Sequence, residues 1–175
     1  PRYGGFVGLH PLTDPRVTFL VPSMGRLGTE LVSAVFEASG FHVAPHPPAD
    51  ENVLKLGRAH TSCKECLPLI LTTGTLLNYA YHNKTEDEIL VYFMASASGP
   101  CRFGQYSVFM EDLVRRLQIP DVAIFSLTSD NSYFGLERQL NYYKAWWALV
   151  ISDVMEDVRS MLLANASDVA AAMEI

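Results

Sequence analysis

The sequence predicts an α/β domain built on a doubly wound, mostly parallel sheet of four strands. Four short apolar runs rich in β-branched residues recur along the chain, and segments with helical spacing of apolar residues separate them. Such alternation favours a parallel sheet with helices on both faces. The chain has 175 residues, of which 49% are hydrophobic and 18% charged, so one folded domain with a substantial core is expected.

The first half of the chain supplies two strands and one long helix. Residues 1–15 are rich in Gly and Pro, so we expect an irregular arm. The run Val17–Val21 predicts a strand buried on both faces, and the helix that follows ends at Gly40. Residues 41–44 predict the second strand, and a short helical segment is expected around residues 52–56.

The second half continues the alternation. A helix is predicted from about Leu67, a third strand at residues 89–94 and a fourth at residues 122–127. Apolar residues at helical spacing predict a further helix between the third and fourth strands.

A long helix is predicted from about Gly135. It carries apolar residues at every third or fourth position and exceeds the length of a typical crossover helix. We expect its far half to pack on a second copy or on another part of a longer protein. Trp146 and Trp147 are interpreted as core residues, with a binding role as the alternative.

Right-handed crossovers leave few topologies, and we predict the flavodoxin-like or Rossmann-like order 2-1-3-4. In such folds ligands gather at the carboxyl ends of the strands. The predicted organisation is an irregular arm at 1–15, an α/β domain with cysteine loops at 16–133, and a long helix with a tail at 134–175, all belonging to a larger protein.

Composition excludes several classes of function. The formal net charge of −6 argues against a broad nucleic-acid interface. The apolar runs are too short to span a membrane, and no signal-peptide pattern is present in the sequence given. Three cysteines are an odd number for a disulfide framework, so a reducing cytoplasm is the expected location.

The cysteines occupy two loops, each of which precedes a predicted helix. Cys63 and Cys66 lie in the first loop, and Cys101 lies in the second. Helix N-termini carry unpaired N–H groups and a partial positive charge, which favour a thiolate. The Cys63-x-x-Cys66 spacing also lets two sulfur atoms reach one metal centre.

Four interpretations of these cysteines remain open at this point. Three thiolates on a [4Fe-4S] cluster would leave one iron open to a substrate. Zinc is the main competitor, since His60 completes a Cys3His set. Cys63 and Cys66 could instead form a redox pair, or all three could be small buried apolar residues.

Other candidate residues carry weaker signals. Glu65, between the cysteines, is a candidate proton donor, although an exposed loop carboxylate is the simpler interpretation. Ser98 and Gly99 are candidate cofactor-binding residues of the second loop. Residues 23–28 could cradle a phosphate, as in a nucleotide- or CoA-binding domain, but an ordinary strand-to-helix turn is favoured.

The two loops resemble a known family. Thr61-Ser62-Cys63-Lys64-Glu65-Cys66-Leu67-Pro68 and Ser98-Gly99-Pro100-Cys101-Arg102-Phe103-Gly104 are similar to segments of the CoA-substrate-specific enzyme activases. The similarity is to the part of those large proteins that is related to the 2-hydroxyacyl-CoA dehydratase component. It covers most of residues 16–130.

The resemblance implies an iron–sulfur role in anaerobic metabolism. A parent protein would carry ATP-binding activase domains that drive low-potential electrons onto a cysteine-bound cluster. In the dehydratases such a cluster passes an electron to a hydroxyacyl-CoA so that water can leave. Cys66 and Cys101 match the family's cysteines, and Cys63 matches less well, so other domains would supply the remaining ligands. The parent would be a redox enzyme of the dehydratase or reductase type, and this chain alone would not be a complete enzyme. The alternative is a non-catalytic Rossmann-like module, with zinc or no metal, that docks the ATPase or substrate domains.

Overall fold

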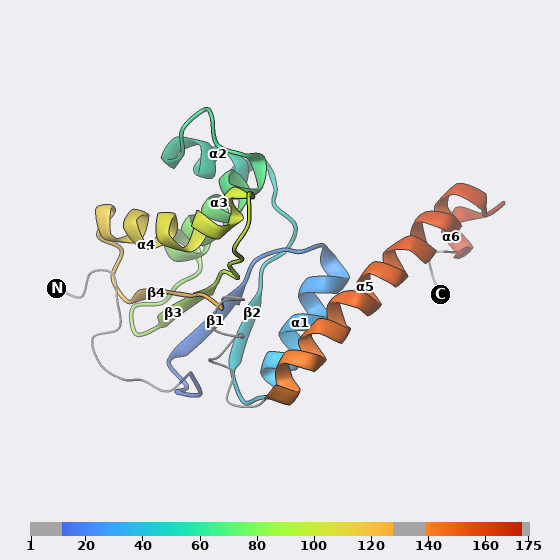
Figure 1. Ribbon diagram of the computed structural model, residues 1–175, viewed down its shortest axis with the longest axis horizontal. Coiled ribbons are helices and arrows are strands. Elements are labelled where there is room, and N and C mark those ends of the chain that lie inside the picture. Colours follow the sequence, from blue (N-terminus) through green and yellow to red (C-terminus); the bar gives the residue numbers. More distant parts are fainter. Residues whose placement is uncertain (1–11, 128–138, 173–175) are drawn as a thin grey trace.

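The computed structural model describes residues 12–127 and 139–172, and in them four strands form one parallel sheet (Figure 1). The strand order is β2-β1-β3-β4, so the predicted α/β class and the order 2-1-3-4 are confirmed. In register, Phe19 lies opposite Val43 on one side and Val91 on the other, and Val91 lies opposite Ala123. The strands are β1 Val17–Val21, β2 His42–Pro45, β3 Ile89–Phe93 and β4 Val122–Phe125.

Helices cover both faces of the sheet. Figure 1 shows α1 and α5 on one face and α2, α3 and α4 on the other. The helical elements are α1 Arg26–Glu37, α2 Glu51–His60, α3 Leu67–His82, the short 3-10 helix η1 Arg102–Gln105, α4 Tyr106–Arg116, α5 Gln139–Asn165 and α6 Val169–Ala172.

Helix α2 is longer than the short segment expected from the sequence. The Asp50 carboxylate accepts a hydrogen bond from the Val53 N–H at 2.9 Å and caps the start of the helix. A cap of this kind satisfies one of the N–H groups that a helix start leaves unpaired. The helix then continues to His60, which brings its end close to the first cysteine loop.

The core is divided by the sheet into two layers, because successive strand residues point to opposite faces. On the α3 and α4 side, Leu20, Leu90 and Tyr92 pack with residues of both helices. On the α1 side, Phe19 packs on Phe36 with 4.8 Å between ring centroids. The uninterrupted apolar strands therefore match a sheet that is buried on both faces.

Helices α2 and α3 approach closely through two glycines. A Cβ atom at Gly57 of α2 would lie 2.0 Å from the carbonyl oxygen of Ile70, and one at Gly74 of α3 would lie 2.0 Å from that of Val53. Each helix therefore uses a glycine to accept the backbone of the other. This contact fixes the start of α3, and with it Cys66, relative to the end of α2.

Helix α5 packs on α1 through small residues. Ala148 and Ser152 are buried, and Ser152 lies against Gly28. The interpretation of Trp146 and Trp147 as core residues is wrong: 57% and 62% of their surfaces are exposed, because the close α1 contact uses other positions of the helix. The predicted helix start near Gly135 and the predicted boundary at 133/134 lie outside the described residues.

Among the helices that the structure describes, α5 included, none combines the length and apolarity needed to cross a membrane.

Candidate cysteine site at the carboxyl edge of the sheet

Two of the three cysteines occupy helix starts. Cys66 is the N-cap residue of α3, with extended backbone angles, and Pro68 lies in the first turn. Cys101 is the N-cap residue of η1, which leads directly into α4. The predicted placement of both cysteines before helices is therefore confirmed, and both lie where the helix dipole favours negative charge.

Tyr106 joins the two cysteine loops. Its hydroxyl oxygen lies 2.6 Å from the Cys66 sulfur, within hydrogen-bonding distance, and its side chain is buried at the start of α4. Burial raises the pKa of Tyr106 well above its ordinary value; the hydrogen bond to Cys66 and the charges of Cys66 and Cys101 raise it further, while a backbone hydrogen bond at Leu69 lowers it. The phenol therefore stays protonated at neutral pH and can donate its hydrogen bond to a Cys66 thiolate.

Cys101 reaches the same edge of the sheet from a different part of the chain. It directly precedes η1, and η1 leads into α4, whose first residue is Tyr106. The fold thus places Cys101 five positions before the tyrosine whose hydroxyl contacts Cys66, although residues 66 and 101 are 35 positions apart in the sequence. Cys66 is half-buried against the core, whereas Cys101 is exposed.

A second link between the loops runs through Arg102. Its guanidinium donates to the backbone oxygen of Lys64 at 3.4 Å and pairs with the Glu65 carboxylate at 3.4 Å. The Ser62 hydroxyl donates to the other oxygen of the same carboxylate at 3.2 Å. Glu65, predicted as a candidate proton donor, is thus held by two partners and helps to fasten the first loop to the second.

The second loop is closed by a tight internal contact. A Cβ atom at Gly104 would lie 2.6 Å from the Ala97 carbonyl oxygen, and the Ser96 hydroxyl donates to the Gly104 oxygen at 3.3 Å. Glycine is needed at position 104 because the side chain of a larger residue would push the Ala97 backbone away. Ser98 and Gly99, predicted to bind a cofactor, lie exposed at the tip.

Cys63 lies in the loop between α2 and α3, outside any helix start. It is exposed, and all three cysteines, which lie within the described residues, are free. Within residues 12–127 and 139–172, no group of three or more His, Cys, Asp or Glu side chains is arranged to hold a metal ion. The structure therefore does not bring together the three-thiol set, or the zinc set with His60, that the sequence pattern suggested.

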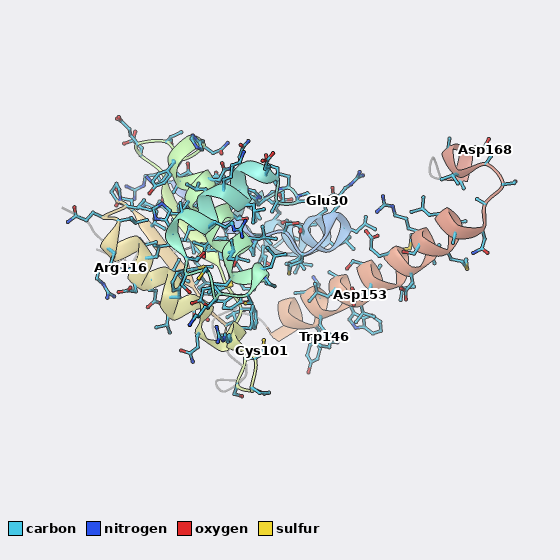
Figure 2. All side chains as sticks on the ribbon, turned by 90° about the horizontal axis from the view of Figure 1, so that it is seen from above. Glu30, Cys101, Arg116, Trp146, Asp153 and Asp168 are labelled. Carbon is cyan, nitrogen blue, oxygen red and sulfur yellow. The ribbon has the colours of Figure 1, made fainter. Side chains whose placement is uncertain are left out.

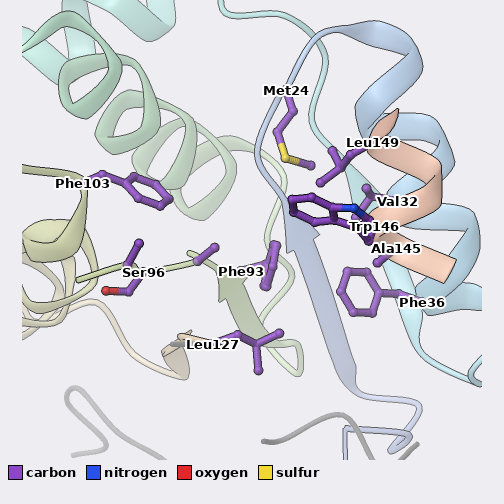
Figure 3. A pocket seen from close by; sticks show the side chains of 12 residues that line it. Met24, Val32, Phe36, Phe93, Ser96, Phe103, Leu127, Ala145, Trp146 and Leu149 are labelled. Atoms are coloured by element: carbon purple, nitrogen blue, oxygen red, sulfur yellow. The ribbon is translucent and has the colours of Figure 1, made fainter. Parts of the chain in front are cut away.

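An apolar cavity of about 220 Å³ lies beside the second loop, which the sequence analysis did not predict. Figure 3 shows Trp146 of α5 and Phe103 of the loop on opposite sides of it. Met24, Phe36 and Phe93 complete much of the wall. Two features of the sequence could have indicated this cavity: the small residues at 95–97, which leave room after β3, and the large side chain of Trp146 in the first half of α5.

Backbone groups of the turn at residues 23–28 form hydrogen bonds with the Thr29 hydroxyl. The Met24 N–H donates to the Thr29 hydroxyl at 2.8 Å, and that hydroxyl donates to the Gly25 oxygen at 2.7 Å. Gly25 has a φ angle of 83°, which favours glycine. The turn thus has the internal bonding of an ordinary strand-to-helix connection.

Fold and site together define a doubly wound α/β domain with two thiols at the edge of the sheet where such folds bind ligands. Comparison of the chain with models of known protein families, with curated proteins and with solved structures finds no significant match.

Proposed function

We propose that this chain contributes two thiolate ligands, Cys66 and Cys101, to an iron–sulfur cluster that it shares with another domain or protein. The observation that carries the proposal is the contact between Cys66, at the start of α3, and Tyr106, which begins the helix that follows Cys101. Cys66 is half-buried against the core, and Cys101 is exposed, which leaves its thiol accessible to another domain.

The donor set fits such a shared cluster. Thiolates are the ligands of iron–sulfur clusters, and the two helix starts offset the negative charge that such a cluster carries. Tyr106 would donate a hydrogen bond to the Cys66 sulfur, and Arg102 would add positive charge at the edge of the site. A bound cluster would supply one-electron chemistry at low potential, whereas the residues of this chain hold, orient and partly shield it.

The wider function follows the sequence resemblance. The chain would receive electrons from an ATP-driven activase and take part in their low-potential transfer to an acyl-CoA substrate, with the other domains of a parent redox enzyme providing the rest of the machinery. The apolar cavity beside Phe103 supports this proposal, because it offers space for an apolar group next to the cysteine loops.

Metal analysis under anaerobic conditions tests the proposal. The chain is purified without oxygen and reconstituted with iron, sulfide and excess thiol, which can complete the coordination. We expect about four iron atoms and four sulfide ions per chain. Cys66→Ser and Cys101→Ser should each remove most of the iron, while Cys63→Ser, the matched control in the same loop, should retain it.

The outcomes separate the hypotheses. Absence of iron from a folded chain, or equal loss from all three variants, would contradict the two-ligand proposal. Zinc near one atom per chain would favour the alternative, a non-catalytic docking module with zinc or no metal. The metal-free form of that alternative is supported by the lack, among the described residues, of any three-donor group.

A further inference from the structure

Helix α5 extends far beyond the domain on which it packs. It has 27 residues, a length of about 40 Å at the usual rise per residue. Figure 2 shows it leaving the body of the molecule, with Asp168 of the following segment at the far end. Beyond Ser152 most of its side chains are exposed. Most helical stability in proteins comes from packing of an apolar face, so this half of α5 needs a covering surface.

Five of the exposed apolar residues of α5 follow a heptad repeat. Successive members are separated by four, three, four and three positions, which gives the 3.5-residue spacing of a seam between two helices. All of them are substantially exposed: Trp147 62%, Ile151 49%, Val154 55%, Val158 39% and Met161 57%.

The seam faces away from the domain. At about 100° per residue, its mean direction lies roughly 120° around the helix from that of the α1 contact at Ala148 and Ser152. Packing on α1 therefore leaves the whole seam free to meet another helix. The spacing indicates what covers it, because a 3.5-residue repeat matches a second helix that has the same repeat.

The seam complements itself when two copies run antiparallel. Ile151 of one copy then lies against Val154 of the other, and the large Trp147 lies against the smaller Val158. Met161 would lie against the aliphatic part of Lys144, whose ammonium group stays in water. Each layer pairs residues of compatible size, and none of the central layers contains a charge.

We propose that two copies of this chain associate through an antiparallel pairing of their α5 helices along this seam. The seam is shorter than the three to four heptads typical of an independent coiled coil. We therefore expect reversible dimerisation, with a Kd on the order of micromolar.

Sedimentation equilibrium of the full chain, from about 1 to about 200 µM, measures this association. The mass should approach twice that of the monomer, and Val158→Glu should raise the Kd roughly thirtyfold or more, because the layer would bury an unpaired charge. Leu163→Glu is the matched control: Leu163 is 46% exposed, close to Val158, but lies on the opposite side of the helix. Its Kd should change by no more than about threefold.

A size exchange tests the antiparallel register. Val158→Trp alone should weaken the dimer, since two tryptophans would then meet in one layer, and adding Trp147→Val should restore it. Failure of the second change to restore the dimer would overturn this register. A monomer at every concentration, or equal effects of Val158→Glu and Leu163→Glu in folded protein, would overturn the proposal itself.

Discussion

Tyr106 is the residue on which the geometry of the cysteine site depends most. Its hydroxyl contacts Cys66, its ring packs edge-on to Phe103 of the second loop, and its backbone begins α4. The Tyr106 side chain therefore links Cys66 to the loop that carries Cys101. Because the pKa of Tyr106 is raised, the hydroxyl keeps its proton as a donor.

Tyr106→Phe should slow the reaction of Cys66 with iodoacetamide at neutral pH. The variant keeps the ring and its packing but removes a donor to the thiolate, the nucleophilic form. A hydrogen bond to a charged group contributes about 1.5–3 kcal/mol, so we expect the rate to fall roughly tenfold. Mass spectrometry of the alkylated peptides measures each cysteine separately.

Cys63 and Cys101 provide the internal controls in the same sample. Both are exposed, whereas the Tyr106 hydroxyl contacts Cys66, so their rates should change by less than about twofold. An unchanged rate for Cys66, with these controls constant and the fold intact, would show that the hydroxyl does not support the thiolate.

At the scale of elements, the contact between α2 and α3 positions the first cysteine loop. Gly57 and Gly74 let the two helices approach until each backbone touches the other. The loop between the helices is short, so its path is set by where α2 ends and α3 begins. A shift of either helix would move Cys66 away from Tyr106.

Gly74→Ala should lower the free energy of unfolding by about 3 kcal/mol. A Cβ atom 2.0 Å from the Val53 oxygen forces the helix backbones apart, and this cost exceeds the gain of about 1 kcal/mol from better helix propensity. Urea denaturation measures the change. Gly28→Ala is the control, because the nearest atom to its Cβ would be the Ser152 hydroxyl, at 3.2 Å, and not a backbone atom. It should change stability by less than about 1 kcal/mol.

Local patterns predicted the strands, their order and the helix starts at the cysteines. The apolar runs at Val17–Val21 and Ile89–Phe93 carry enough β-branched and aromatic residues to define strands without tertiary information. Chain connectivity and right-handed crossovers then restrict the order. The same rules predict that the loops of Cys66 and Cys101 lie at the carboxyl edge of the sheet.

Features that depend on interhelical packing could not be predicted. Glycines in α2 and α3 are indistinguishable in sequence from ordinary helix-weakening glycines until the neighbouring backbone is known. Trp146 and Trp147 were misread because large apolar residues are commonly buried, whereas α5 contacts α1 through Ala148 and Ser152. The placement of Cys63 in a turn between α2 and α3 depends on the loop path, which spacing alone does not determine.

At the scale of the whole molecule, three tyrosines make the fold sensitive to alkaline pH. The pKa values of Tyr79, Tyr92 and Tyr106 are all raised, in each case chiefly by burial. For Tyr79, the nearby Glu88 charge and the hydrogen bond to that carboxylate, at 3.1 Å, help to raise the pKa to about 12. The folded chain thus holds these protons more tightly than the unfolded chain.

The free energy of unfolding should therefore fall as the pH rises above about 10, where unfolded tyrosines begin to lose their protons. The contribution of Tyr79 is fully present below pH 10 and is lost as the pH rises toward 12, the pKa of the folded state. Tyr79→Phe should make the decline between these values less steep, although it lowers stability at neutral pH by removing the bond to Glu88. Urea denaturation at successive pH values measures the slope. Tyr81→Phe, at an exposed position on the same helix, should leave the slope as in the original chain. The slope reports the difference in bound protons between the unfolded and folded states. Equal slopes for the original chain and both variants would therefore contradict a role for Tyr79.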